Sequence, residues 1–215
     1  MKAGILGSGA VGQVLARAFY AEGYEVQLGT DHAGKEKIVQ FKTDNPGIRV
    51  GSFKETAAFA EILVLAVAGA AVDEVIASAV KSNFANKVVI DTTNPIAAAP
   101  PVNGVLKYFT SMDESLMEKI QRQLPEAKLI KAFNSVGNAA MYKPVYKDGK
   151  PSMFICGNDE AAKKTVTGIL AVFGWETEDM GKVEAARAIE PLCMLWCIPG
   201  FLNNQWTHAF KLLKA

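Results

Sequence analysis

Three glycines near the start of the chain, Gly7, Gly9 and Gly12, are spaced as a phosphate-binding turn requires. A short apolar run precedes them, and residues 13–20 after them place their apolar side chains on one helical face. Glycines at this spacing make a tight turn, let the backbone approach a pyrophosphate and let the helix pack closely on the strand. The helix N-terminus adds free N–H groups and a positive dipole end. This stretch therefore predicts a dinucleotide site, against the alternative of a structural turn.

Other nucleophilic or metal-binding side chains are few: the chain has three cysteines and two histidines, namely Cys156, Cys193, Cys197, His32 and His208. Cys193 and Cys197 are spaced to share one helix face, but a closed metal site needs about four ligands. We therefore expect no metal there, and two small apolar residues in a buried helix. An odd number of cysteines argues against a disulfide framework. The separated histidines give little basis for a nucleophilic triad.

The composition fits a soluble protein with a sizeable core. The 215 residues are 50% hydrophobic and carry a formal net charge of +1, which suits one domain or a large domain with a small one. So balanced a charge indicates neither a nucleic-acid nor a membrane partner. The N-terminal apolar run is too short for a signal peptide, and residues 62–72 are too short to cross a bilayer. We expect a cytoplasmic protein.

Strands and helices are expected to alternate along the first 133 residues. Six strands are predicted at residues 2–6, 24–28, 48–50, 62–67, 87–91 and 128–133. Helices separate them, and S-x-x-E capping boxes are expected at Ser52–Glu55 and Ser111–Glu114. Because parallel strands need right-handed crossovers, this pattern predicts a Rossmann-type, doubly wound α/β fold with strand order 3-2-1-4-5-6.

The rest of the chain predicts a small extension. Strands at residues 152–156 and 175–180 flank a helix at 159–173, and a helical region at 184–213 is interrupted by Pro191, Pro199 and Gly200. This last region is apolar on more than one face, so it is buried against either the sheet or a second subunit, and a homodimer through it is allowed. We expect residues 1–150 to form the dinucleotide-binding domain. Residues 151–215 form a compact extension packed on it, or continue it as one domain.

In an open α/β sheet the ligand lies outside the carboxyl ends of the strands, where the strand order reverses. Five segments follow predicted strands at that edge: Gly7–Gly12, Gly29–His32, Ala66–Val72, Asp91–Pro95 and Phe133–Val136. We expect them to form one crevice for the pyrophosphate, the adenosine ribose and the nicotinamide.

Six blocks of sequence resemble one group of known proteins. They are Gly7-Ser8-Gly9-Ala10-Val11-Gly12, Gly29-Thr30, Asp91-Thr92-Thr93-Asn94-Pro95, Lys131-Ala132-Phe133-Asn134-Ser135-Val136, Phe154-Ile155-Cys156-Gly157-Asn158-Asp159 and Ala186-Arg187-Ala188-Ile189-Glu190-Pro191-Leu192. The blocks resemble the coenzyme F420-dependent NADP oxidoreductases and the related cytosolic reductase domain of the STEAP metalloreductases. The resemblance implies hydride transfer between NAD(P)H and a flavin, a deazaflavin such as F420 or another small acceptor.

The resemblance also implies roles for particular residues. Ser8, Ala10 and Val11 would meet the pyrophosphate, Ala66, Val67 and Ala68 would lie along the riboses, Thr93, Asn94 and Pro95 would border the nicotinamide, and Asn134 would face its ring. Simpler interpretations stay open: Asn94 as a turn residue, Asn134 as a cap, and Arg187 with Glu190 as an ion pair within one helix.

The choice between NADP and NAD depends on Thr30 and Asp31. In NADP-using relatives a Ser or Thr is followed by an arginine that holds the 2′-phosphate, whereas Thr30 is followed here by a carboxylate. An acid at this strand end favours NAD through the ribose 2′-OH, although Asp31 falls one residue beyond the usual position. If the cofactor is NADP, Lys35 or Lys37 would supply, in place of the arginine, the positive charge that the 2′-phosphate needs. We expect NADP on family grounds, with NAD left open.

No catalytic acid or base is expected, because a nicotinamide passes hydride directly to a stacked acceptor ring. The acceptor pocket would be completed by the Pro-rich residues 96–110 and the region around Trp196 and Phe201, unless these aromatics pack in the core or in a dimer. Two other functions stay open: a non-catalytic dinucleotide-binding module that senses redox state, and a short imine or hydroxyacid reductase.

Overall fold

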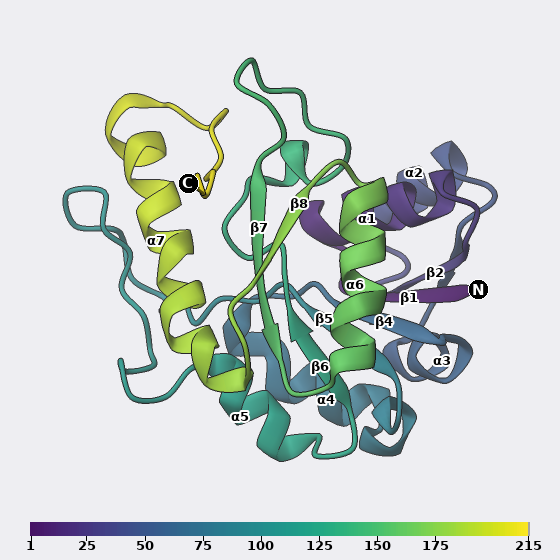
Figure 1. Cartoon of the computed structure of the whole chain (residues 1–215). Coiled ribbons are helices and arrows are strands. Elements are labelled where there is room, and N and C mark those ends of the chain that lie inside the picture. Colours follow the sequence, from purple (N-terminus) through teal and green to yellow (C-terminus); the bar gives the residue numbers. More distant parts are fainter. Residues whose placement is uncertain (215) are drawn as a thin grey trace.

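The computed structural model describes residues 1–214, which form an eight-stranded sheet covered by helices on both faces (Figure 1). The strands are β1 (Lys2–Leu6), β2 (Glu25–Gly29), β3 (Arg49–Gly51), β4 (Ile62–Leu65), β5 (Val88–Asp91), β6 (Lys128–Lys131), β7 (Ser152–Gly157) and β8 (Glu176–Asp179). The helices are α1 (Ala10–Ala21), α2 (Glu36–Asp44), α3 (Phe53–Phe59), α4 (Val72–Ala79), α5 (Leu116–Gln123), α6 (Glu160–Val172) and α7 (Ala186–Asn203).

The strand order is β3-β2-β1-β4-β5-β6-β7-β8, so the predicted order of the first six strands and the Rossmann-type fold are confirmed. The first six strands are parallel, and β7 continues the sheet antiparallel to β6. The order reverses between β1 and β4, which are neighbours with Leu6 beside Leu65. The nicotinamide and adenosine halves of a dinucleotide would lie on either side of this point.

Two cores explain why the central strands read as continuous apolar runs. Ile5 and Val64 point into one core with α1 and α6, whereas Leu63 and Leu65 point into the other with α4 and α5. All four residues of β4 are buried, as expected for a parallel strand covered on both faces. The pairing of alternate residues with opposite cores fixes the register of the sheet.

The C-terminal helix differs from its prediction. In place of an interrupted region over residues 184–213, α7 runs without a break through Pro191 and Pro199 to Asn203. It ends because Asn204 has a left-handed conformation (φ 54°). The Trp206 ring then covers Gly200, where a Cβ would lie 2.3 Å from the indole, and the chain turns back. Residues 204–214 therefore return beside β7 instead of continuing the helix.

The predicted capping box at Ser111–Glu114 is also wrong. Ser111 and Glu114 form a turn, and the box lies four residues later, where Ser115 Oγ accepts a hydrogen bond from Glu118 N and Glu118 accepts one from Ser115 N. Both segments match the S-x-x-E pattern, but apolar helix positions follow only the second. The other box, Ser52–Glu55, is confirmed at the start of α3. The remaining predicted elements are present, with ends that differ by a few residues.

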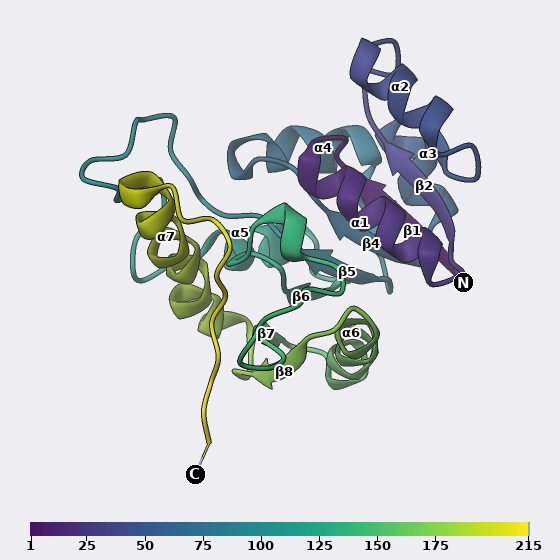
Figure 2. The ribbon, with the colours of Figure 1, turned by 90° about the horizontal axis from the view of Figure 1, so that it is seen from above.

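At one end of the sheet, α7 stands beside the loop that precedes α5, while α2 and α3 occupy the other end (Figure 2). The predicted loop at residues 96–110 is an irregular hairpin with bridges between Ile96 and Tyr108 and between Val102 and Val105. The segment Val183–Asn203 is long and apolar enough to cross a bilayer by length and composition, a test that core helices of soluble proteins also pass.

Candidate functional site

The glycine turn after β1 has a distinct requirement at each glycine. Gly7 has φ 126°, and a Cβ there would lie 2.1 Å from the carbonyl oxygen of Ala66. A Cβ on Gly12 would lie 1.9 Å from the carbonyl oxygen of Gly7. A Cβ on Gly9 would meet no protein atom within 4 Å and would point into open space. Gly7 and Gly12 are thus required by packing, whereas Gly9 leaves room for a ligand beside the backbone.

The N-terminus of α1 opens onto that space. No side chain caps the helix at Gly9, and its first turn holds no acidic residue. The first N–H groups of a helix have no partner within it and attract anions. Open space at Gly9 together with these donors fits a pyrophosphate at residues Ala10 and Val11.

A cavity of about 520 Å³ continues from the glycine turn along the carboxyl ends of β1, β2 and β4. It brings together eight residues predicted from the sequence: Gly7, Ser8, Gly9, Thr30, Asp31, Ala66, Val67 and Ala68. The Thr30 hydroxyl is buried and accepts hydrogen bonds from Ser8 Oγ (2.9 Å) and His32 N (3.1 Å). These bonds join the glycine turn to the end of β2.

Some lining residues were not predicted, and some predicted residues, Lys35 among them, lie outside the cavity. His32 lies in the predicted segment Gly29–His32, whereas Phe53 and Glu74 line the cavity without having been predicted, because the approach of α3 and α4 to this edge has no local sequence signal. Lys37 also lines the cavity, whereas Lys35 lies outside it at the start of α2. The lining thus carries two carboxylates, Asp31 and Glu74, and one ammonium group, that of Lys37.

A larger depression of about 720 Å³ lies at the opposite edge of the sheet, where Lys128 begins β6. Lys128 forms an ion pair there with Asp159 (3.7 Å), and none of the five strand-end segments reaches it. We therefore assign the candidate site to the smaller cavity, because that cavity lies where the strand order reverses.

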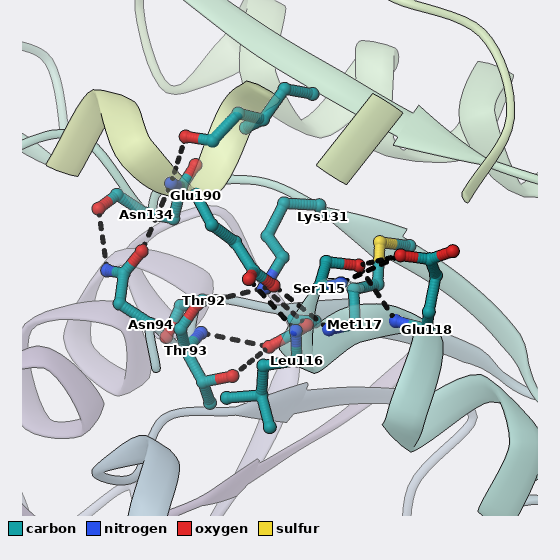
Figure 3. Close-up of polar contacts among 12 residues, drawn as sticks. Thr92, Thr93, Asn94, Ser115, Leu116, Met117, Glu118, Lys131, Asn134 and Glu190 are labelled. Atoms are coloured by element: carbon teal, nitrogen blue, oxygen red, sulfur yellow. Dashed lines mark hydrogen bonds and ion pairs between the residues drawn. The ribbon is translucent and has the colours of Figure 1, made fainter. Parts of the chain in front are cut away.

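The carboxyl ends of β5 and β6 carry a cluster of three buried charges (Figure 3). The side chain of Lys131 is fully buried, and its Nζ lies 2.7 Å from Asp91 Oδ2 and 3.0 Å from Glu190 Oε1. Lys131 Nζ also donates to the carbonyl oxygen of Thr93 (2.8 Å). Burial opposes the charge of Lys131, but Asp91 and Glu190 outweigh burial, so the pKa of Lys131 is raised. The ammonium group is therefore charged at neutral pH.

Glu190 reaches this cluster from α7 and also caps α5. Its carboxylate accepts hydrogen bonds from the N–H groups of Leu116 and Met117, both 2.9 Å long. Arg187, one turn earlier, binds Glu118 with both Nε and Nη2. The predicted ion pair between Arg187 and Glu190 is therefore wrong, because each side chain points to a partner on another element.

Asn94 and Asn134 join the segments that follow β5 and β6 through hydrogen bonds between their side chains and backbones. Asn94 Nδ2 donates to the carbonyl oxygen of Asn134 (2.8 Å), and Asn134 Nδ2 donates to Asn94 Oδ1 (3.2 Å) and to the carbonyl oxygen of Ile189 (2.8 Å). Among the described residues, Asn134 Oδ1 has no hydrogen-bond partner. Thr93, Asn94, Pro95 and Asn134 do not line the 520 Å³ cavity, so their predicted contact with nicotinamide stays a prediction.

Trp196 has its ring packed against other protein side chains. It is 7% exposed, it stacks on His208 with ring centroids 5.1 Å apart, and its Nε1 donates to the carbonyl oxygen of His208 (2.8 Å). Its ring also lies against Gly137, where a Cβ would come within 2.9 Å. Phe201 is 45% exposed, and its ring packs edge-on against Trp206. Of the two aromatics, only Phe201 presents a substantial surface outward.

Comparison with known proteins bears directly on the predicted resemblance. Residues 2–95 match the family described as "NADP oxidoreductase coenzyme F420-dependent". The resemblance to this family is confirmed. Over 119 residues the chain is 32% identical to an F420-dependent NADP reductase of Methanocaldococcus jannaschii, which covers 54% of this chain and 51% of that protein.

Two further proteins are similar to this chain over nearly all of its length. The metalloreductase STEAP3 of Rattus norvegicus is 28% identical over 206 residues, which is 94% of this chain and 39% of that protein. The chain thus spans about two fifths of the length of STEAP3 and about half the length of the Methanocaldococcus reductase. A crystal structure from Arthrobacter sp. FB24, described as that of a candidate F420-dependent NADP reductase, is 29% identical, covers 99% of both chains and has a TM-score of 0.90.

An imine reductase of Streptomyces aurantiacus has the same fold in its matching part. It is 18% identical, with a TM-score of 0.68 over 94% of this chain and 63% of that one. At this identity the likeness shows the fold alone. The Methanocaldococcus, Rattus and Streptomyces proteins are all named as reductases. The Arthrobacter protein is described as a candidate reductase.

Proposed function

We propose that the chain is an NAD(P)H-dependent oxidoreductase that moves hydride between a nicotinamide and a flavin, a deazaflavin such as coenzyme F420, or another small acceptor. One observation carries the proposal: the uncapped α1 N-terminus and the open space at Gly9 adjoin a cavity where the strand order reverses. The names of the relatives, which pair NADP with F420, support the choice of reaction.

In this proposal the protein binds and orients rather than supplying an acid or a base. A bound nicotinamide supplies the hydride. The backbone at Gly9 and the first turn of α1 hold the pyrophosphate, and Thr30 with Asp31 meets the adenosine ribose. Asn94 borders the nicotinamide. The buried groups beneath Asn94 exclude water from that side and keep the turn rigid.

We propose NADP as the cofactor, on the name of the family, with NAD as its competitor. Lys37 and His32 line the cavity beside Thr30 and are the groups available to a 2′-phosphate. Asp31 opposes that phosphate and favours the 2′-OH of NAD. The balance between these charges decides the preference.

The first test is titration of the purified protein with NADPH and NADH, followed by Gly9→Ala and a matched control. Because the new methyl group of Gly9→Ala would enter the space assigned to the pyrophosphate and touch no protein atom, it should leave the melting temperature unchanged and weaken nucleotide binding. Gly168→Ala in α6 also meets open space and should change neither affinity. Failure of the wild type to bind either nucleotide would refute the proposal.

Turnover separates the enzyme from a non-catalytic binding module. NAD(P)H oxidation should be measured with FMN, FAD and F420 in turn, and the proposal expects turnover with at least one of them. Tight nucleotide binding without oxidation by any of the three acceptors favours the redox-sensing module. Reduction of a cyclic imine with no flavin turnover favours the short imine or hydroxyacid reductase.

We also propose a cytoplasmic homodimer assembled through α7. Leu195, Phe201 and Leu202 are exposed on this helix by 45% or more, and residues 191–203 contain no charged side chain. Such an apolar face is typical of an interface. Light scattering should give twice the chain mass, and Leu202→Lys should return a monomer. Val145→Lys, at a residue 95% exposed in the loop before β7, is the control and should leave the dimer intact.

A further inference from the structure

The buried charges at the ends of β5 and β6 occupy a place where apolar side chains would hold the elements together at lower cost. Asp91 and Lys131 are fully buried, and the side chain of Glu190 is 3% exposed. Removing charges from water is unfavourable, and a well-packed apolar cluster of similar volume is often as stable. An ion cluster differs from apolar packing in being directional. Each charged group must point at a particular atom of its partner, so the cluster fixes the orientation of the residues that form it.

We propose that Lys131 is a positioning residue that holds the Asn94–Asn134 amide pair in place beneath the nicotinamide half of the cofactor. The inference rests on the proposed function, because it assigns Asn94 to the nicotinamide side. It adds that the geometry of this side is set by a lysine that does not touch the cofactor.

The contacts of Thr93 show how Lys131 acts. Its carbonyl oxygen accepts from Lys131 Nζ (2.8 Å), and its N–H and hydroxyl donate to Asp91 Oδ1 (2.9 and 2.7 Å). Both peptide groups of Thr93 are thereby held by the Asp91–Lys131 ion pair. Since Asn94 is the next residue, its direction follows from the orientation of Thr93.

Asn94 is held closely on two further sides. Its carbonyl oxygen packs on Gly69, where a Cβ would lie 2.1 Å away. Its side chain exchanges two hydrogen bonds with Asn134. A shift of the Thr93–Asn94 turn therefore disturbs the loops after β4, β5 and β6 together, which are the loops on the nicotinamide side of the strand reversal.

The backbone before Asn134 is strained, so the amide pair needs external support. Phe133 has φ 62°, a left-handed conformation that is unfavourable for a bulky residue, and it is 1% exposed. This conformation turns the chain so that Asn134 meets Asn94 and the carbonyl oxygen of Ile189. Strain of this kind persists only where the surrounding structure over-determines it. Glu190, beside Ile189, supplies that support through Lys131.

The adenosine half of the site provides an internal reference. None of Asp91, Lys131 and Glu190 lines the cavity that contains Gly9, Thr30 and Asp31. A change in the ion cluster should therefore act more strongly on the nicotinamide side than on the part of the cavity formed by Gly9, Thr30 and Asp31. ADP-ribose, or its 2′-phosphate, contains every part of the dinucleotide except the nicotinamide ring, so the ratio of its affinity to that of the whole dinucleotide isolates the contacts of the ring.

The test uses the double variant Lys131→Met with Asp91→Asn, which removes one charge of each sign and leaves Glu190 to cap α5. We expect an ADP-ribose affinity within about twofold of wild type and a loss of about tenfold for the preferred dinucleotide. The control is Lys163→Met, because Lys163 is another buried lysine with two carboxylate partners, Glu160 and Asp179, both at 2.8 Å. This control should lower the melting temperature without changing the ratio of the two affinities.

A gentler variant keeps the test decisive if the double variant does not fold. Thr93→Val removes one hydroxyl from the cluster and should lower dinucleotide affinity about threefold, again with ADP-ribose unchanged. Equal loss of both ligands, or of neither, in a folded variant overturns the positioning role. Wild-type protein that binds neither ligand overturns the proposed function instead, and the two failures are thereby distinguished.

Discussion

Replacing Asp31 should shift the ratio of the NADPH and NADH affinities towards NADPH. Asp31 is exposed at the cavity that also holds Thr30, His32 and Lys37. At a separation of about 6 Å and an effective dielectric constant of about 40, two unit charges interact by about 1.4 kcal/mol, which is a factor of ten in affinity. A 2′-phosphate carries about −1.5 to −2 charges. Asp31→Asn should therefore raise NADPH affinity at least tenfold at low salt.

The same substitution should weaken NADH binding, because a carboxylate that accepts from the ribose 2′-OH is lost. A hydrogen bond to a charged group contributes about 1.5–3 kcal/mol, so a loss of about tenfold is expected. Asp31→Arg should move the ratio of the two affinities further in the same direction. The dissociation constants are measured by nicotinamide fluorescence at about 20 and 500 mM salt, since screening should reduce the NADPH effect at the higher concentration.

The control is Asp148→Asn, which removes an exposed carboxylate from the loop before β7, outside the cavity. It changes net charge equally and should leave both affinities unchanged. If Asp31→Asn gives the wild-type ratio at low salt, Asp31 does not face the 2′ position. If Asp148→Asn reproduces the effect, the cause is overall charge rather than a local contact.

Three further predictions follow from local features. Val80→Gly should raise the melting temperature by about 1–3 °C in a thermal scan, because Val80 has φ 66° and relief of about 1–2 kcal/mol of strain exceeds the entropy cost of glycine. Hydrogen bonds from Arg187 lower the pKa of Glu118 to about 2, so its contribution of about 3 kcal/mol is complete above pH 4.5 and lost as pH falls towards 2. Denaturant titrations should show that pH slope reduced in Glu118→Gln. A thiol reagent should modify Cys197 first, because a hydrogen bond from Cys193 lowers its pKa, whereas burial raises the pKa of Cys156 to about 12.

The parts of the fold that sequence predicts are those with local signals. The glycine spacing at residues 7–12 identifies the turn that follows β1. The continuous apolar run of β4 identifies a strand buried on both faces. Right-handed crossovers then leave few strand orders, which is why the order of the first six strands is predictable. The end of α7 was not, because it depends on a single left-handed residue, Asn204, and on a ring that packs back on Gly200.

The candidate site divides in the same way. Ser8, Thr30 and Ala66 follow directly from strand ends and line the predicted cavity. The partners of Lys131 do not follow from its neighbours, because Glu190 comes from a helix 59 residues later in the chain. A helical spacing of three residues suggested that Arg187 and Glu190 pair with each other, yet both turn towards α5. The local rule fails here because the Glu190 carboxylate meets the N-terminus of α5 and the buried ammonium group of Lys131, while Arg187 makes a two-pronged contact with the Glu118 carboxylate.

The match to the F420-dependent family ends at residue 95, but the turn at that point is completed from elsewhere in the chain. Asp91 and Asn94 lie within the match, while their partners Lys131 and Asn134 lie on and just after β6. Glu190 then joins Lys131 to α7, and the carbonyl oxygen of Ile189 joins Asn134 to it. The turn after β5 is therefore held by three parts of the sequence, of which only the first lies within the matched residues 2–95.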